Sequence, residues 1–130
     1  MLVDNIYYEQ GKKPGQWVRG RKFGAESGIF GSRGVFTGGY ITPTFGNVNT
    51  IDYIPISTPG NATDFGDLTQ GRRAPAATSD GSRGVFGGGY VGNVPNANTI
   101  DYITIATPGN ATDFGDLTVS RENLAATSGD

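Results

Sequence analysis

The sequence predicts an all-β fold made of repeated small sheets. The stretch Asn49–Thr69 returns as Asn98–Thr118 with only two substitutions, so the chain carries a tandem repeat. A period near 50 residues is typical of solenoids, propellers and arrays. The runs inside each repeat are rich in β-branched and aromatic residues, which favour strands. The chain holds 22 glycines, and no window shows the apolar stripe of an amphipathic helix.

The repeat divides the chain into one degenerate partial unit at 1–30, a first full unit at 31–80 and a second at 81–130. In the second unit the pattern predicts four strands, at 83–86, 100–105, 112–118 and 122–128. Pro108-Gly109-Asn110 is typical of a turn. Four short strands joined by turns form one propeller blade, so we expect about three four-stranded antiparallel sheets per chain.

The partial unit at 1–30 follows the repeat only weakly. Leu2–Tyr8 stands where the Ile-Asp-Tyr strand would lie, Trp17 stands opposite Leu68, and Gly20-Arg21 stands opposite Gly71-Arg72. Residues 23–27 match the small-residue strand of the full units, and chance similarity explains these matches equally well.

Several repeated residues are expected to hold the sheets together. The double glycines should end a strand in a tight bend. A cross-strand ion pair is expected once in each unit, because opposite charges commonly pair across strands. A ligand-binding role for these charges is the alternative. The repeated structural residues are Gly38, Gly39, Gly88, Gly89, Arg33, Asp52, Arg83 and Asp101. The side chains expected in the core are Phe36, Phe86, Ile54, Ile103 and Tyr102.

One loop differs between the two full units and is therefore the candidate binding surface. The loop after Tyr40 and the loop after Tyr90 differ in sequence and by one residue in length. Insertions in repeat proteins often map to the binding face. Aromatic rings offer large, rigid contact surfaces, although ordinary packing is the alternative. The candidate ligand-binding residues are Tyr40, Phe45, Tyr90 and Asn96.

Composition argues against several classes of function. The net charge is −2, which favours neither nucleic acid nor an anionic membrane as a partner. The chain holds no cysteine and no histidine. Its N-terminus lacks the basic start and apolar core of a secretory signal. The charge is uneven, because residues 1–35 hold six basic and three acidic residues, whereas the remainder is acidic.

No motif predicts catalysis, a metal or a cofactor. Asp64-Phe65-Gly66 and its copy at 113–115 spell the kinase metal-binding tripeptide, but the other kinase motifs are missing. Asp64 with Asp67 offers paired carboxylates, which calcium sites and glycosidases also use. Such a pair recurs in both units, whereas an active site brings different residues together once. Capping of turns by these carboxylates is favoured, and we expect a non-enzymatic protein.

The repeat resembles two known kinds of sequence. Gly38-Gly39 and Gly88-Gly89, followed by a strand with Tyr53 or Tyr102, resemble a Kelch repeat. Phe or Leu replaces the usual tryptophan of that family, except at Trp17. The sequence RGVFGGG, followed by NTIDYITIATPGNATDFGDLT, is similar to repeats in virion structural proteins of marine tailed phages, including those infecting cyanobacteria.

These resemblances imply a Kelch-like β-propeller in a phage particle or tail appendage, with a structural or adhesive function. The alternative is a carbohydrate- or protein-binding propeller module that is not viral. The expected partners are further copies of this chain, other virion proteins and a cell-surface glycan. The chain would be made in the host cytoplasm and reside in the virion. About three sheets are too few to close a ring, so we expect the last strand of one chain to complete the first sheet of another.

Overall fold

The computed structural model describes residues 31–42, 46–92 and 96–129. The described strands belong to one compact unit, Ser32–Asp130. Within the described ranges there are seven strands and no helix, which confirms the all-β fold. The expectations for Leu2–Tyr8, Trp17, Phe45 and the rest of the partial unit lie outside the described residues.

The first sheet holds three antiparallel strands in the order β1-β2-β3. Their bounds are Arg33–Ile41, Gly46–Pro55 and Thr63–Asp67. The β1 and β2 strands are long because they extend into the loop that differs between the repeats. A register shift lies between Thr37 and Gly39, but β1 continues to Ile41, so the strand end predicted at Gly38-Gly39 is wrong. The strand continues because Tyr40 and Ile41 pair with Asn47 and Gly46 of β2.

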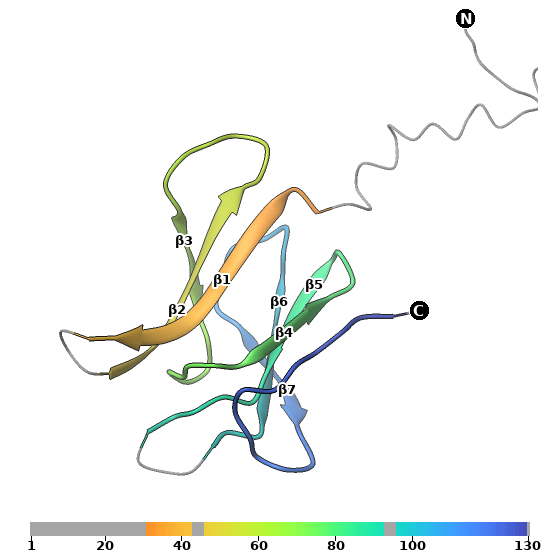
Figure 1. Cartoon of the computed structure of the whole chain (residues 1–130). Coiled ribbons are helices and arrows are strands. Elements are labelled where there is room, and N and C mark those ends of the chain that lie inside the picture. Colours follow the sequence, from red (N-terminus) through yellow and green to blue (C-terminus); the bar gives the residue numbers. More distant parts are fainter. Residues whose placement is uncertain (1–30, 43–45, 93–95, 130) are drawn as a thin grey trace, which may run out of the picture. The chain divides into compact units, whose positions relative to one another are not determined.

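The second sheet holds four antiparallel strands in the order β4-β5-β6-β7 (Figure 1). Their bounds are Ala76–Ser79, Arg83–Gly87, Thr99–Thr104 and Thr112–Asp116. By sequence β4 ends the first repeat, yet it pairs with β5 of the second, with Ala77 opposite Phe86. One sheet therefore contains a strand from the preceding repeat. The described residues hold one three-stranded and one four-stranded sheet, and the propeller remains a prediction.

The strand predicted at 122–128 is wrong. This segment repeats the Ala-Ala-Thr-Ser sequence of β4, but it forms no strand. The difference has a physical reason. The backbone groups of β4 pair with β5, the first strand of the following repeat. No described strand offers an equivalent edge to Ala125–Ser128. The backbone of this segment therefore forms no strand hydrogen bonds with a described neighbour.

The core lies between the two sheets and draws on both. Its buried members are Ile51, Phe65 and Leu68 from the first repeat and Phe86 and Ile103 from the second. The burial predicted for Phe86 and Ile103 is confirmed, whereas Ile54 and Tyr102 are only half-buried. The burial predicted for Phe36 is wrong.

Phe36 is 57% exposed although its sequence context matches that of Phe86. The strand that carries Phe86 has β4 beside it, and in the described part of the chain β1 has only β2 as a neighbour. Position in the assembly of strands, not local sequence, therefore decides the exposure of this ring.

Candidate functional site

Two buried charged side chains of the described residues, Arg72 and Asp101, join the first repeat to the second. Asp101, on β6, is fully buried and accepts three hydrogen bonds from the first repeat. Thr69 donates its backbone N–H at 3.2 Å and its hydroxyl at 2.7 Å. Arg72 donates from Nη2 at 2.9 Å and also reaches the carbonyl of Phe86 at 3.2 Å. We call Thr69, Arg72 and Asp101 the junction triad.

The junction triad corrects the expected pairing of charges. Arg83 lies opposite Thr104 in the strand register, and the partner of Asp101 is Arg72. Across the described ranges, Arg72–Asp101 is the one salt bridge, so the predicted pair of Arg33 with Asp52 is not formed either. The reason is register, because Asp101 lies opposite Phe86 and three positions away from Arg83 along β5.

Burial and charge act in opposite directions on Arg72. Burial lowers the pKa of its guanidinium, and the nearby Asp101 carboxylate opposes that change. Its Nε and Nη1 atoms have no partner among the described protein atoms. A buried guanidinium of this kind is costly unless its counter-charge remains in place, so the two side chains form one structural unit.

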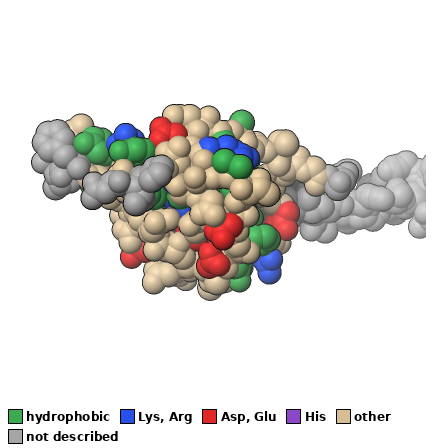
Figure 2. Space-filling model, turned by 90° about the horizontal axis from the view of Figure 1, so that it is seen from below, with side chains coloured by type: hydrophobic (Ala, Val, Ile, Leu, Met, Phe, Trp, Pro, Cys, Tyr) green, Lys and Arg blue, Asp and Glu red, His purple; other side chains and the backbone are tan. Residues whose placement is uncertain are grey.

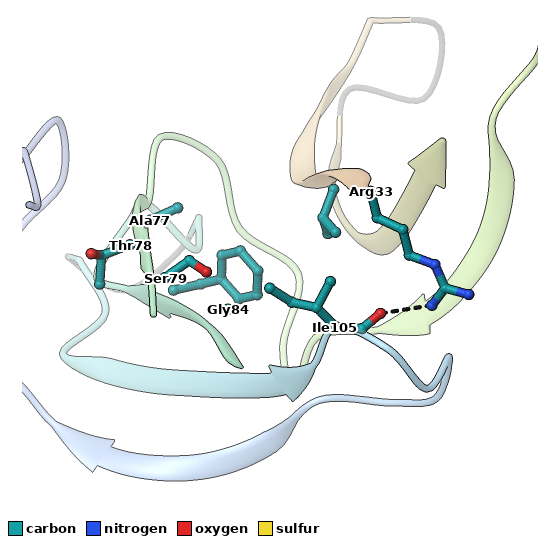
Figure 3. A pocket seen from close by; sticks show the side chains of 8 residues that line it. Arg33, Ala77, Thr78, Ser79, Gly84 and Ile105 are labelled. Atoms are coloured by element: carbon teal, nitrogen blue, oxygen red, sulfur yellow. Dashed lines mark hydrogen bonds between the residues drawn. The ribbon is translucent and has the colours of Figure 1, made fainter. Parts of the chain in front are cut away.

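The repeated arginines at the start of the Gly-Val-Phe strands, Arg33 and Arg83, contact aromatic rings and form no described salt bridge. The Arg33 guanidinium lies 4.6 Å from the ring centre of Tyr53, and that of Arg83 lies 4.8 Å from Tyr102. These distances are typical of cation–π contacts. Arg33 also donates to the carbonyl of Ile105 at 2.7 Å, which adds a second link between the repeats (Figure 3).

The double glycines also serve the links between strands. Gly38 and Gly88 have φ angles of +65° and +72°, a conformation that favours glycine. The following residues, Gly39 and Gly89, donate to the carbonyls of Arg72 and Arg121, each at 2.9 Å. These glycines therefore shape the backbone. The strand β5 ends at Gly87, as expected, whereas β1 continues past Gly38-Gly39.

The two candidate tyrosines come together around a residue that the sequence reading missed. The Arg73 guanidinium lies 4.9 Å from the ring centre of Tyr40 and 4.2 Å from that of Tyr90. Arg73 and Tyr90 also exchange two backbone hydrogen bonds, at 3.1 and 2.8 Å. The variable loops of both repeats are thus joined through one arginine. We call Tyr40, Arg73 and Tyr90 the tyrosine–arginine stack.

The stack borders a polar cavity of about 490 Å³. Asn47 lines the same cavity and donates from Nδ2 to the carbonyl of Tyr90 at 3.0 Å. Its Oδ1 atom has no partner among the described atoms. Asn96, also a candidate, does not line the cavity but forms an isolated bridge with Tyr90. Phe45 lies outside the described residues.

A departure from the repeat could have revealed Arg73. The sequence Gly71-Arg72-Arg73 of the first unit becomes Ser120-Arg121-Glu122 in the second. Arg72 and Arg121 correspond, whereas a basic residue is replaced by an acidic one at the next position. Differences within an otherwise constant repeat point to residues that are not part of the common scaffold, and Arg73 is such a residue.

The stack is equipped for recognition. Tyrosine rings offer apolar faces and hydroxyl groups, the arginine offers planar N–H donors, and Asn47 offers an amide. Such a set suits a polar ligand with flat faces, such as a sugar ring or a peptide. The carboxylates of Asp64 and Asp113 are exposed and separate from it. On the face seen in Figure 2, acidic and basic side chains lie in small separate groups.

Within the described residues no group of three or more acidic side chains is arranged to hold a metal ion. In that same part of the chain, no helix has the length and apolar character needed to cross a membrane. No protein-family model and no curated protein matches this chain.

Proposed function

We propose that this chain is a non-enzymatic structural or adhesion protein of a phage particle, built from Kelch-like repeats. One observation supports a structural task above all. The buried charged pair, Arg72 with Asp101, joins one repeat to the next. Arg33 likewise reaches from β1 to the carbonyl of Ile105 in the second repeat. Charged groups here serve the connection of neighbouring units.

The assignment to a phage particle depends on the sequence similarity of the repeat to phage proteins. It is tested by looking for the chain in purified phage particles. An antibody raised against the chain should label tailed particles from a lysate under the electron microscope, and its peptides should appear in purified particles by mass spectrometry. Detection only in the soluble fraction, with particles free of the chain, would contradict a virion function.

A second function is favoured by the tyrosine–arginine stack. It makes the chain a carbohydrate- or protein-binding module, either on a virion or elsewhere. The two loops that differ between the repeats meet at this stack, and its cavity is polar. Such a surface would bind a cell-surface glycan through stacking on tyrosine and hydrogen bonds from Arg73.

A glycan array tests this second function. Tyr90→Ala and Arg73→Ala should abolish binding to any glycan that the unmodified chain retains, while Ile56→Ala should leave it unchanged. Ile56 is a suitable control because it is highly exposed and lies outside the stack. Equal binding by all three variants would contradict a glycan site here.

The non-enzymatic assignment has its own test. If a hydrolytic activity accompanied the purified chain and disappeared in Asp64→Asn and Asp113→Asn, the exposed carboxylates would be catalytic. We expect no such activity, because the two carboxylates occupy equivalent positions in two copies of one scaffold.

A further inference from the structure

We propose that the segment Thr118–Ser128 of one copy docks on β1 and Asp52 of a second copy, so that the chain assembles head to tail. The inference depends on the contact between the two repeats inside one chain, which provides a template. It does not depend on the chain being viral.

The template has two parts. The first is a strand pair, with Ala77 opposite Phe86 and Thr78 opposite Val85. The second is the junction triad, in which Thr69 and Arg72 bind the buried Asp101. Both parts place the end of one repeat against the start of the next.

The accepting surface of this template is repeated at β1, and no described strand covers it as β4 covers β5. Among the described strands, β1 pairs only with β2, and Phe36 on it is exposed. Asp52 lies opposite Asp64 in the strand register, just as Asp101 lies opposite Asp113. Like charges directly opposite each other are destabilising in a sheet. At Asp101 the positive charge of Arg72 offsets the repulsion between the two carboxylates. At Asp52 no described salt bridge offsets it.

The docking segment repeats the other half of the template. Thr118 and Arg121 correspond to Thr69 and Arg72, and Ala125–Ser128 has the sequence of β4. Arg121 is exposed, and its described side-chain contact is a long one, 3.5 Å to the carbonyl of Val119. The donors needed to bind an Asp52 carboxylate are therefore present and available.

The docking segment also holds the position that β4 holds in the first repeat. The end of β4 borders a cavity of about 270 Å³ with Arg33 and Val35 (Figure 3). Thr127 and Ser128 border a cavity of about 260 Å³ with the corresponding pair, Arg83 and Val85. The segment thus lies beside its own repeat as β4 does, with no β5-like strand paired to it among the described residues.

A second copy fits the accepting surface better than the N-terminal sequence of the same chain. With Trp17 opposite Leu68, Arg21 stands in the place of Arg72, but Val18 stands in the place of Thr69 and cannot donate a hydroxyl hydrogen bond, so only part of the junction triad is repeated there. Thr118 retains that hydroxyl. The resulting contact joins different surfaces of two copies, which gives rings when the rotation closes and filaments when it does not.

Exchanging the two charges tests the proposal with the full chain. Sedimentation and mass photometry across a concentration series should show a dimer or a larger assembly for the unmodified protein. Asp52→Arg or Arg121→Asp alone brings like charges together and should raise the dissociation constant roughly 30-fold or more. An equal mixture of the two variants should associate again, because each interface then joins opposite charges. Circular dichroism should show that both variants are folded.

The matched control carries both substitutions in one chain. It retains the net charge of the unmodified protein and should associate as well as that protein does. A chain that stays monomeric at every concentration would overturn the proposal and indicate that another segment covers β1. Association that both single variants leave unchanged, or a mixture that fails to restore it, would overturn it equally.

Discussion

Two regions of nearly identical sequence, the first and the second repeat, differ most in what covers them. Phe86 is 4% exposed, while its counterpart Phe36 is 57% exposed. At the other side of the repeat the order is reversed, because Phe65 is 2% exposed and Phe114 is 53% exposed. Among the described phenylalanines, each repeat has one that is buried and one that is exposed, and the two buried rings belong to the core that the repeats share.

Inside each repeat, equivalent residues make the same local contacts. Tyr53 meets Phe65 edge to face at 5.6 Å, and Tyr102 meets Phe114 in the same way at 5.7 Å. The backbone N–H of Leu68 donates to the carbonyl of Asn49, and that of Leu117 donates to the carbonyl of Asn98, both at 2.7 Å. Local sequence therefore reproduces local geometry, and a repeat becomes well packed only where a neighbour completes it.

The largest expected difference concerns the buried carboxylate. Asp101→Ala should lower the free energy of unfolding by about 3–5 kcal/mol, because Arg72 would remain buried without its counter-charge. Asp52→Ala should cost less than about 1 kcal/mol in dilute solution, where Asp52 has no arginine partner among the described residues. Urea denaturation of both variants measures this. Equal losses in dilute solution would contradict the contrast, and a loss at Asp52 that grows with protein concentration would connect it to assembly.

The aromatic rings give the second contrast. Phe86→Ala and Phe65→Ala should each cost about 3–5 kcal/mol, the usual range for removing a buried ring. Phe36→Ala and Phe114→Ala should each cost under about 1 kcal/mol in the isolated chain, because both rings are exposed. Thermal and urea unfolding of the four variants provide the measurement. A large loss at Phe36 in dilute solution would show that something covers β1 within one chain.

The double glycines mark where the two repeats should respond alike. Gly38→Ala and Gly88→Ala should each cost at least about 1–2 kcal/mol, because an L-residue is strained at positive φ. A Cβ would also crowd the carbonyl of Arg72 in one case and of Arg121 in the other. The two losses, measured by urea unfolding, should agree closely. A loss of stability confined to one repeat would show that contacts specific to that repeat, and not the shared sequence, determine the backbone conformation at the glycines.

The smallest expected effect lies in the turn between β4 and β5. The backbone N–H groups of Arg83 and Ser82 donate to the Asp80 carboxylate and lower its pKa. A lowered pKa in the folded state contributes stability above the unfolded value near 4 and loses it as the pH falls through the folded value. Asp80→Ala should therefore melt slightly lower than the unmodified chain at pH 7.

The difference in melting temperature caused by Asp80→Ala should shrink as the pH falls below about 4. A melting difference that stays constant down to low pH would show that the carboxylate charge has no part in the turn. The first repeat lacks this cap, because Phe30 stands in the corresponding place in the sequence.

Part of the candidate site was also accessible from the sequence. The variable loops pointed to Tyr40 and Tyr90, which do lie close together around one cavity. Arg73 was missed because it lies about 30 residues from Tyr40 and belongs to no motif. Its approach to both rings results from the pairing of its backbone with Tyr90, which is a contact between separate segments.

The sequence by itself determined the all-β fold, the repeat period, the strands at 83–86 and 100–105, the end of β5 at its glycines and the burial of Phe86 and Ile103. These follow from local preferences, which act over a few residues along the chain. The tertiary structure alone decided that β4 joins the next repeat, that Asp101 takes Arg72 as its partner, and that Phe36 remains exposed. Each of these depends on which segment lies alongside, and identical sequences carry no information about their neighbours.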